Sequence, residues 1–134
     1  NKIKQILSST DIRYIVFEDY MNHEEISILK KISDIMIHVQ TTDQFSGSMQ
    51  EELYAGNIVI NGKWLQYDIL KQMGGFFLEI NNVSEINDKI IYSIENLEEL
   101  KKKCKVNKKI IWELSSWESN IEKWWSIYNR AKLL

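Results

Sequence analysis

Short apolar runs recur along the first half of the chain and predict the strands of a sheet. Four of them, at 13–17, 34–39, 57–61 and 76–80, are rich in β-branched and aromatic residues. Runs of this length and composition favour buried strands. Apolar and polar positions do not alternate within them, so each strand is expected to be covered on both faces, as in a parallel sheet.

Helical patterns lie between these runs. Asn22, with Glu25 three residues later, forms a capping-box pattern that predicts a helix start. A second helix is expected over 48–55, capped by its first residue and followed by Gly56 in the C′ position. A third is expected over 65–73, closed by two glycines.

Beyond Ser84 the pattern predicts helices only. Lysines at 101–103 are expected on a solvated helix face. Near the end, apolar residues at spacings i, i+3, i+4 and i+7 predict one apolar stripe on a closing helix, and its aromatic residues are interpreted as packing residues. The stripe consists of Ile121, Trp124, Trp125 and Tyr128.

The alternation of strands and helices predicts an α/β fold. We expect one domain over 1–134, with a parallel Rossmann-like sheet, helices on both faces and closing C-terminal helices. A doubly wound nucleotide domain usually has about six strands. Only about four are visible here, so the chain is expected to be the later part of such a domain, with the first strands upstream.

Charge and composition narrow the function classes. A net charge of −2 gives no basic footprint for nucleic acid. The single Cys104 cannot form an internal disulfide, which favours a reducing, cytoplasmic location. No apolar run reaches the roughly 20 residues of a membrane-spanning helix. His23 and His38 have no cluster partners at metal-ligand spacing, so neither a metal nor another cofactor is expected.

The segment 43–56 carries the strongest candidate chemistry. Asp43 is followed eight positions later by Glu51, with a predicted helix start between them. Backbone N–H groups at a helix start attract phosphate. Ligands that carry both phosphate and hydroxyl groups suit two carboxylates beside such a start, and a nucleotide-sugar is a ligand of this kind.

The order of these motifs resembles the donor-binding domain of retaining GT-B glycosyltransferases of the glycosyltransferase group 1 type. In that family a strand is followed by E-G-F-G, then L-E-A-x-A-x-G and another apolar strand. The corresponding segments here are 43–46, 50–56 and 58–60. Upstream, 33–37 is similar to the family's a-D-v-f-v. Downstream, 116–118 is similar to the F-S-W-E motif that opens its closing helix.

The resemblance implies transfer of a sugar from a nucleoside-diphosphate sugar to a glycan or lipid-linked acceptor. Catalysis in this family needs no metal in the site. The acceptor domain and the basic residues for the diphosphate would lie upstream, so this chain alone would be inactive. A lipid-linked acceptor would place the parent enzyme in the cytoplasm, at the inner face of the membrane.

The two acidic residues receive different roles by resemblance. Asp43 would face the transferred sugar and stabilise positive charge at the anomeric carbon. The alternative is a loop aspartate that bonds nearby backbone N–H groups. Glu51 would accept hydrogen bonds from the ribose hydroxyls, which a carboxylate can do in pairs. Its alternative is a capping box with Ser48.

Two loops would complete the donor site. Backbone N–H groups of the turn before the second helix would reach sugar or phosphate, unless this is an ordinary strand-to-helix turn. After the third run, a lysine would meet a phosphate and a tryptophan would wall the sugar or base, with packing against the next helix as the tryptophan's alternative. These residues are Phe45, Ser46, Gly47, Ser48, Lys63 and Trp64.

Two further classes stay open from the sequence. One is a non-catalytic α/β interaction module that kept the fold and lost the site. The other is a flavodoxin-like or receiver-like domain, although the clustered acids and lysine that receivers need cannot be assembled from this sequence. The oligomeric state, the donor base and the sugar are not determined by these patterns.

Overall fold

A three-stranded parallel sheet lies at the centre of the computed structural model, which describes residues 2–43 and 45–131. The strands are β1 (Ile35–His38), β2 (Ile58–Gly62) and β3 (Leu78–Ile80), in the order β1-β2-β3. The register pairs Ile35 with Ile58, and Ile60 with Leu78. The α/β class and the parallel sheet predicted from the sequence are therefore confirmed, with three strands in the described residues.

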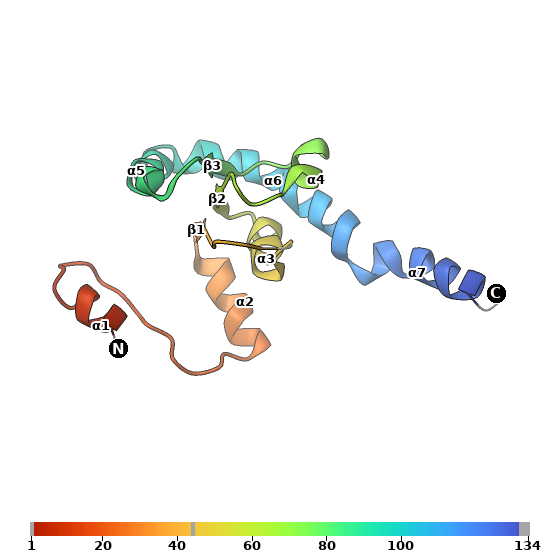
Figure 1. Cartoon of the computed structure of the whole chain (residues 1–134), viewed down its shortest axis with the longest axis horizontal. Helices are drawn as coiled ribbons and strands as arrows, with labels where there is room; N and C mark the ends of the chain where they lie inside the picture. Colours follow the sequence, from red (N-terminus) through yellow and green to blue (C-terminus); the bar gives the residue numbers. More distant parts are fainter. Residues whose placement is uncertain (1, 44, 132–134) are drawn as a thin grey trace.

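Helices surround the sheet and extend beyond it (Figure 1). The helices cover both faces of the sheet. The neighbouring β2 residues Ile58 and Val59 point to opposite faces, and each packs in a different cluster. Val59 packs in a cluster with Met49, whereas Ile58 packs with Cys104. The helices are α1 (Lys2–Leu7), α2 (His23–Ile32), α3 (Gly47–Ala55), α4 (Asp68–Gln72), the 3-10 helix η1 (Val83–Glu85), α5 (Ile86–Glu95), α6 (Leu97–Ser115) and α7 (Trp117–Ala131).

Two of the predicted helix ends are confirmed by their caps. The Asn22 side chain accepts a hydrogen bond from the Glu25 backbone N–H at 3.0 Å, and the Glu25 carboxylate accepts one from the Asn22 N–H at 2.8 Å. This reciprocal pair is the capping box expected for α2. Gly56 ends α3 with φ of 83°, a left-handed conformation that glycine adopts at little cost.

The start of the second helix differs from the prediction. Ser46, and not Ser48, is the N-cap of α3, and its Oγ accepts from the Met49 N–H at 3.3 Å. Phe45 adopts a positive φ of 57°, so the chain turns sharply before Ser46 and the helix begins at Gly47. The capping box of Ser48 with Glu51 is therefore wrong.

The predicted strand over 13–17 is also wrong. The segment is extended but lies outside the sheet, and Ile15 and Phe17 are 78% and 54% exposed. An apolar run forms a strand only where another strand supplies its hydrogen bonds. No described strand pairs with this segment, which leads from α1 to α2 along the outside of the molecule (Figure 1).

The predicted helix over 65–73 is present only as α4. The first part of the predicted segment is a turn instead, in which the Leu65 N–H donates to the Gly62 carbonyl at 2.9 Å. Tyr67 is 1% exposed in this turn, so burial of its ring overrides the helical pattern. The helix ends as expected before Gly74, which has φ of 82°.

A buried amide fixes the entry to β3. Asn107 of α6 is 2% exposed, and its Oδ1 accepts from the Phe76 N–H at 2.7 Å. Its Nδ2 donates to the Phe76 carbonyl at 2.7 Å. The side chain thus satisfies both backbone groups of one residue, as a neighbouring strand would. The predicted strand over 76–80 is thus present as β3 over Leu78–Ile80, and the Asn107 side chain binds the backbone of Phe76 just before it.

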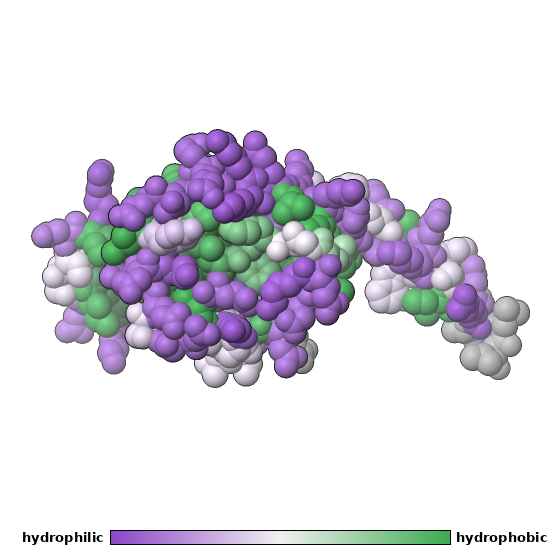
Figure 2. Space-filling model, turned by 90° about the horizontal axis from the view of Figure 1, so that it is seen from above, coloured by the Kyte–Doolittle hydropathy of each residue, from purple (hydrophilic) through white to green (hydrophobic). Residues whose placement is uncertain are grey.

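The closing helix projects from the body. Figure 1 shows α7 as an arm continuing beyond α6, and Figure 2 shows side chains of intermediate and high hydropathy along this arm. The predicted stripe is present on the helix, but its residues do not pack against the described chain. Trp124, Trp125 and Tyr128 are 50%, 64% and 61% exposed. The interpretation of these aromatics as packing residues is therefore wrong for this chain.

The Asn107 contact generates a stability prediction. Replacement of Asn107 by Ala leaves the Phe76 N–H and carbonyl without their partner in a buried position, and each unpaired group costs about 1–3 kcal/mol. We expect the free energy of unfolding to fall by about 2–4 kcal/mol in urea titrations, with an unchanged m-value. The exposed Asn87 of α5 gives the matched control, and Asn87→Ala should change the free energy by less than about 0.5 kcal/mol. Equal effects of the two substitutions would contradict the role of Asn107.

Candidate functional site

A histidine, an aspartate and a tyrosine meet at the carboxyl edge of the sheet. His38 ends β1, Asp43 lies in the loop that follows, and Tyr67 lies in the turn after β2. His38 Nε2 is 2.8 Å from Asp43 Oδ2, and the Tyr67 hydroxyl donates to the same oxygen at 2.5 Å. An ionised carboxylate only accepts, so the first contact assigns a proton to His38 Nε2. Asp43 is thus held from two strands at the edge where parallel sheets bind ligands.

Burial shapes the electrostatics of this cluster. The His38 side chain is 1% exposed and that of Asp43 is 16% exposed. Burial, and then the hydrogen bond to Asp43, raise the pKa of Tyr67 to about 12, because both favour the neutral hydroxyl. Tyr67 therefore stays a donor to Asp43 across the physiological pH range.

The same tyrosine organises the loop between β1 and α3. The Ser46 N–H donates to the Tyr67 oxygen at 2.9 Å, so one of the predicted backbone donors is used within the chain. The centroids of the Phe45 and Tyr67 rings lie 5.9 Å apart. The backbone carbonyl of Phe45 accepts a hydrogen bond from the Gln50 side chain at 2.9 Å. These contacts hold Phe45 in its left-handed conformation, which costs energy for a bulky residue.

Asn61 adds a buried polar group at the same edge. The register places it beside His38 on one side and Glu79 on the other. Asn61 is 0% exposed, and its Nδ2 donates to the Gly62 carbonyl at 3.0 Å. Its Oδ1 has no hydrogen-bond partner among the described residues. His38, Asn61 and Glu79 therefore form a row of polar side chains across one face of the three strands.

The loop after β2 is tied to the loop after β1. The Trp64 Nε1 donates to the Gln40 carbonyl at 2.7 Å, and its ring covers Gly62. A Cβ on Gly62 would lie 2.4 Å from that ring, so any other residue there would force the Trp64 ring to move. Trp64 is 38% exposed and Lys63 is exposed. The exposed part of Trp64 and the Lys63 ammonium lie at the ligand edge.

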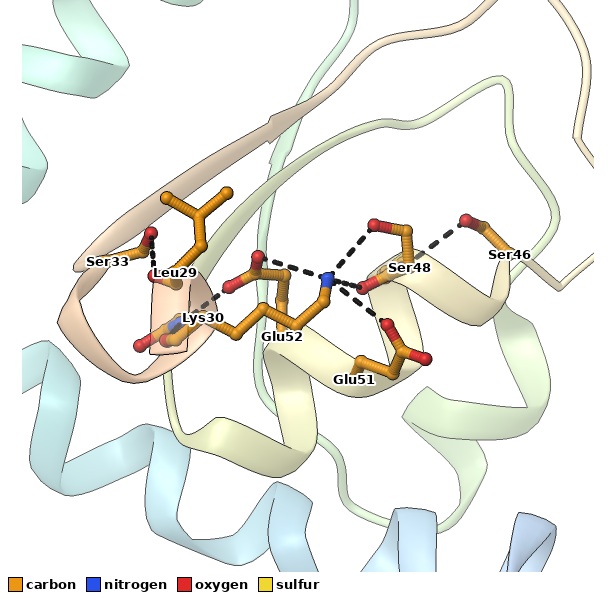
Figure 3. A network of polar contacts seen from close by, with 9 residues as sticks. Leu29, Lys30, Ser33, Ser46, Ser48, Glu51 and Glu52 are labelled. Carbon is orange, nitrogen blue, oxygen red and sulfur yellow. Dashed lines mark hydrogen bonds and ion pairs between the residues drawn. The ribbon is translucent and has the colours of Figure 1, made fainter. Parts of the chain in front are cut away.

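Glu51 lies in a second group, around Lys30 of α2 (Figure 3). Lys30 Nζ is 3.3 Å from Glu51 Oε2 and 3.4 Å from Glu52 Oε1. It also donates to the Ser48 carbonyl at 3.4 Å and the Ser48 Oγ at 3.2 Å. The Glu51 side chain is 61% exposed, whereas that of Glu52 is 10% exposed. Glu51 therefore stays open to ligands, and Glu52 is the structural partner of Lys30.

Beside this pair, α2, α3 and α6 enclose a groove of about 850 Å³. Gly47 and Glu51 line it from α3, together with Tyr54. Trp112 of α6 and Lys31 of α2 lie on its walls. The groove is thus a surface between helices, whereas the cluster around Asp43 lies at the end of the strands.

The predicted site residues thus form two groups. Asp43, Phe45 and Ser46 meet at Tyr67, and Ser48 and Glu51 meet at Lys30; no contact joins Asp43 to Glu51 directly in the described contacts. Sequence reasoning missed His38, Tyr67, Asn61 and Lys30. The signal for two of them was present, because His38 and Asn61 are polar residues that end apolar runs, which places them at the ligand edge of a parallel sheet.

Comparisons with family models, with curated proteins and with solved structures find no match to this chain. Within residues 2–43 and 45–131, no group of three or more His, Cys, Asp and Glu side chains is arranged to hold a metal ion. In the same residues, no helix has the length and apolar character needed to cross a membrane.

The Tyr67 cluster generates a pH prediction. The hydroxyl ionises near pH 12 in the folded chain and near 10 when unfolded. A raised folded pKa means that its contribution to stability is complete below pH 10 and is lost as pH rises towards 12. In a titration of the six tyrosines by ultraviolet absorbance, we expect one late step, and Tyr67→Phe should remove it. The control Tyr20→Phe, at an 86% exposed position, should retain the late step; its loss there would refute the assignment.

Proposed function

We propose that this chain is the donor-binding part of a glycosyltransferase. The parent enzyme would move a sugar from a nucleoside-diphosphate sugar to a glycan or lipid-linked acceptor, at the cytoplasmic face of a membrane. The observation that carries the proposal is the position of Asp43, which is held by His38 and Tyr67 at the carboxyl edge of a parallel sheet. Ligands of α/β sheets bind at this edge.

Asp43 would act on the sugar. Its carboxylate lies in a largely buried cluster, where a fixed negative charge stabilises a developing positive charge better than it does in water. His38 and Tyr67 both contact Oδ2, so they fix the orientation of the carboxylate. This arrangement supports a role in stabilising the anomeric carbon as the bond to the diphosphate breaks.

The nucleotide would be held by the start of α3 and the loop after β2. Glu51 would accept the ribose hydroxyls, for which its exposed carboxylate is suited. The N–H groups of Gly47 and Ser48 point from the first turn of α3, where the helix dipole favours a phosphate. Lys63 would add a positive charge, and Trp64 would form a wall beside the base or sugar.

A second candidate function is a non-catalytic interaction module. Two observations favour it: Glu51 is paired with Lys30, and α7 presents an uncovered aromatic stripe. In this case the polar cluster at the sheet edge would be structural, and the chain would act through its helices.

An NMR titration with UDP, GDP, ADP and CMP tests the donor site. We expect one nucleotide to shift the backbone signals of 43–56 with an affinity of about 1 mM, which corresponds to about −4 kcal/mol. Glu51→Ala should weaken that binding roughly tenfold, because the ribose hydroxyls lose their acceptor. The control Glu95→Ala removes an exposed carboxylate from α5 and should leave the binding unchanged.

The outcomes separate the two candidates. Saturable shifts over 43–56 that depend on Glu51 support the donor site and identify the base. If the nucleotide shifts the NMR signals of Glu51→Ala and of wild type equally, Glu51 does not bind the ribose. The absence of shifts with all four nucleotides would favour the interaction module.

A further inference from the structure

The aromatic stripe of α7 is an apolar surface that the described chain leaves exposed. Trp124 and Tyr128 lie side by side, with ring centroids 6.5 Å apart, and Trp117 is 68% exposed at the start of the helix. Contiguous exposed patches of this kind mark interaction sites in proteins. Figure 1 shows why the stripe is uncovered: α7 points away from the body.

The groove between α2, α3 and α6 has complementary properties. Its lining includes apolar and aromatic side chains, among them Ile26, Tyr54 and Trp112, of which the two aromatics are 38% and 42% exposed. Its charged rim is mostly basic, because Lys31 and Lys108 lie there beside the Lys30–Glu51 pair. Neither Lys31 nor Lys108 forms an ion pair with the described part of the chain.

The charges of α7 match this rim. Glu118 and Glu122 are four residues apart, so they lie on one flank of the helix, next to Trp125. Neither carboxylate forms an ion pair with the described residues. An amphipathic helix that lies in an apolar groove between α2 and α6 would bring this acidic flank to a basic rim.

The connection between the two surfaces indicates how they meet. One residue, Ser116, separates α6 from α7, and it also lines the groove. Each α7 therefore leaves its body at the mouth of its own groove and points away from it. A two-fold axis near Ser116 would bring each α7 to the groove of a second copy, as in a closed two-fold dimer.

We infer that two copies of this chain form a reciprocal dimer in which α7 of each copy docks into the α2–α3–α6 groove of the other. The size is adequate. The four half-exposed aromatic residues of α7 would each bury on the order of 100 Å² of accessible surface in the dimer. The groove that receives them would bury a similar area. These residues are Trp117, Trp124, Trp125 and Tyr128. Two such contacts amount to roughly 1,600 Å², the usual size of a stable interface.

Sedimentation velocity over a range of concentrations tests the dimer. We expect wild type to dimerise at micromolar concentrations and Trp124→Asp to weaken the dimer at least about tenfold, since buried Trp residues dominate interface energies. The control Ser126→Asp places the same charge on the polar face of α7 and should leave the dimer intact. Tyr128→Ser repeats the test should Trp124→Asp fail to fold, as judged by its NMR spectrum.

A mixing experiment tests the reciprocal geometry. Trp112→Asp alters the groove, and alone it should be monomeric like Trp124→Asp. A mixture of the two variants contains one intact helix and one intact groove per pair, so we expect a heterodimer weaker than wild type. A spin label on Asn129→Cys, mixed with isotope-labelled wild type, should broaden NMR signals of Tyr54 and Ile26 in the other copy. Cys104 will not react, because it is buried and burial raises its pKa to about 11.

Several outcomes would overturn the inference. One is a wild-type chain that stays monomeric at several hundred micromolar; another is a dimer that Trp124→Asp leaves unchanged. A mixture without heterodimer, or spin-label broadening outside the groove, would reject the reciprocal docking. Gly47 and Glu51 also line the groove, so a bound nucleotide would compete with α7 of the other copy. The sedimentation and mixing experiments contain no nucleotide, so their outcomes leave the donor-site proposal to its own test.

Discussion

The buried ion pair of Glu52 and Lys30 holds the helical layer together. Both side chains are nearly buried, and Glu52 also accepts from Asn57, which donates to the Lys30 carbonyl at 2.7 Å. Lys101 of α6 then donates to the Asn57 Oδ1 at 2.8 Å. Loss of one partner from such a pair leaves a buried charge and costs about 3–5 kcal/mol. These four side chains, together with the apolar cluster that joins Met49 of α3 to Ile111 of α6, set the relative position of α2, α3 and α6. The groove between these helices depends on that position.

This constraint also separates the two neighbouring carboxylates of α3. Adjacent positions on a helix point about 100° apart, so the inward orientation of Glu52 leaves Glu51 at the surface. The ion pair of Glu51 with Lys30 is exposed and contributes little to stability, about 0–1 kcal/mol. A ligand that displaces it loses little energy. The structural demand on Glu52 is thus compatible with a binding role for Glu51.

The sequence was a good guide where local chemistry decides the structure. The Asn22 capping box and the Gly56 helix end act through neighbouring residues, and both are confirmed. Prediction from the sequence failed where partners that are distant along the chain decide the structure. The run at 13–17 has no strand to pair with, and the contact of His38 with Tyr67 joins residues 29 positions apart. Spacing along the chain carries no record of such contacts, so the roles of Tyr67 and Lys30 emerged only from the structure.

The order of the sheet has a consequence for handling the protein. β1 is an edge strand, so its outer N–H and carbonyl groups have no partner strand in the described chain, and Ile37 on this strand is 45% exposed. The sequence of β1 contains no Lys or Pro, the residues that commonly guard such edges against aggregation. Strand addition at this edge relies on main-chain hydrogen bonds, which salt screens little. Charged residues introduced into β1 would then reduce precipitation from concentrated solutions, whereas a change in ionic strength would have little effect on it.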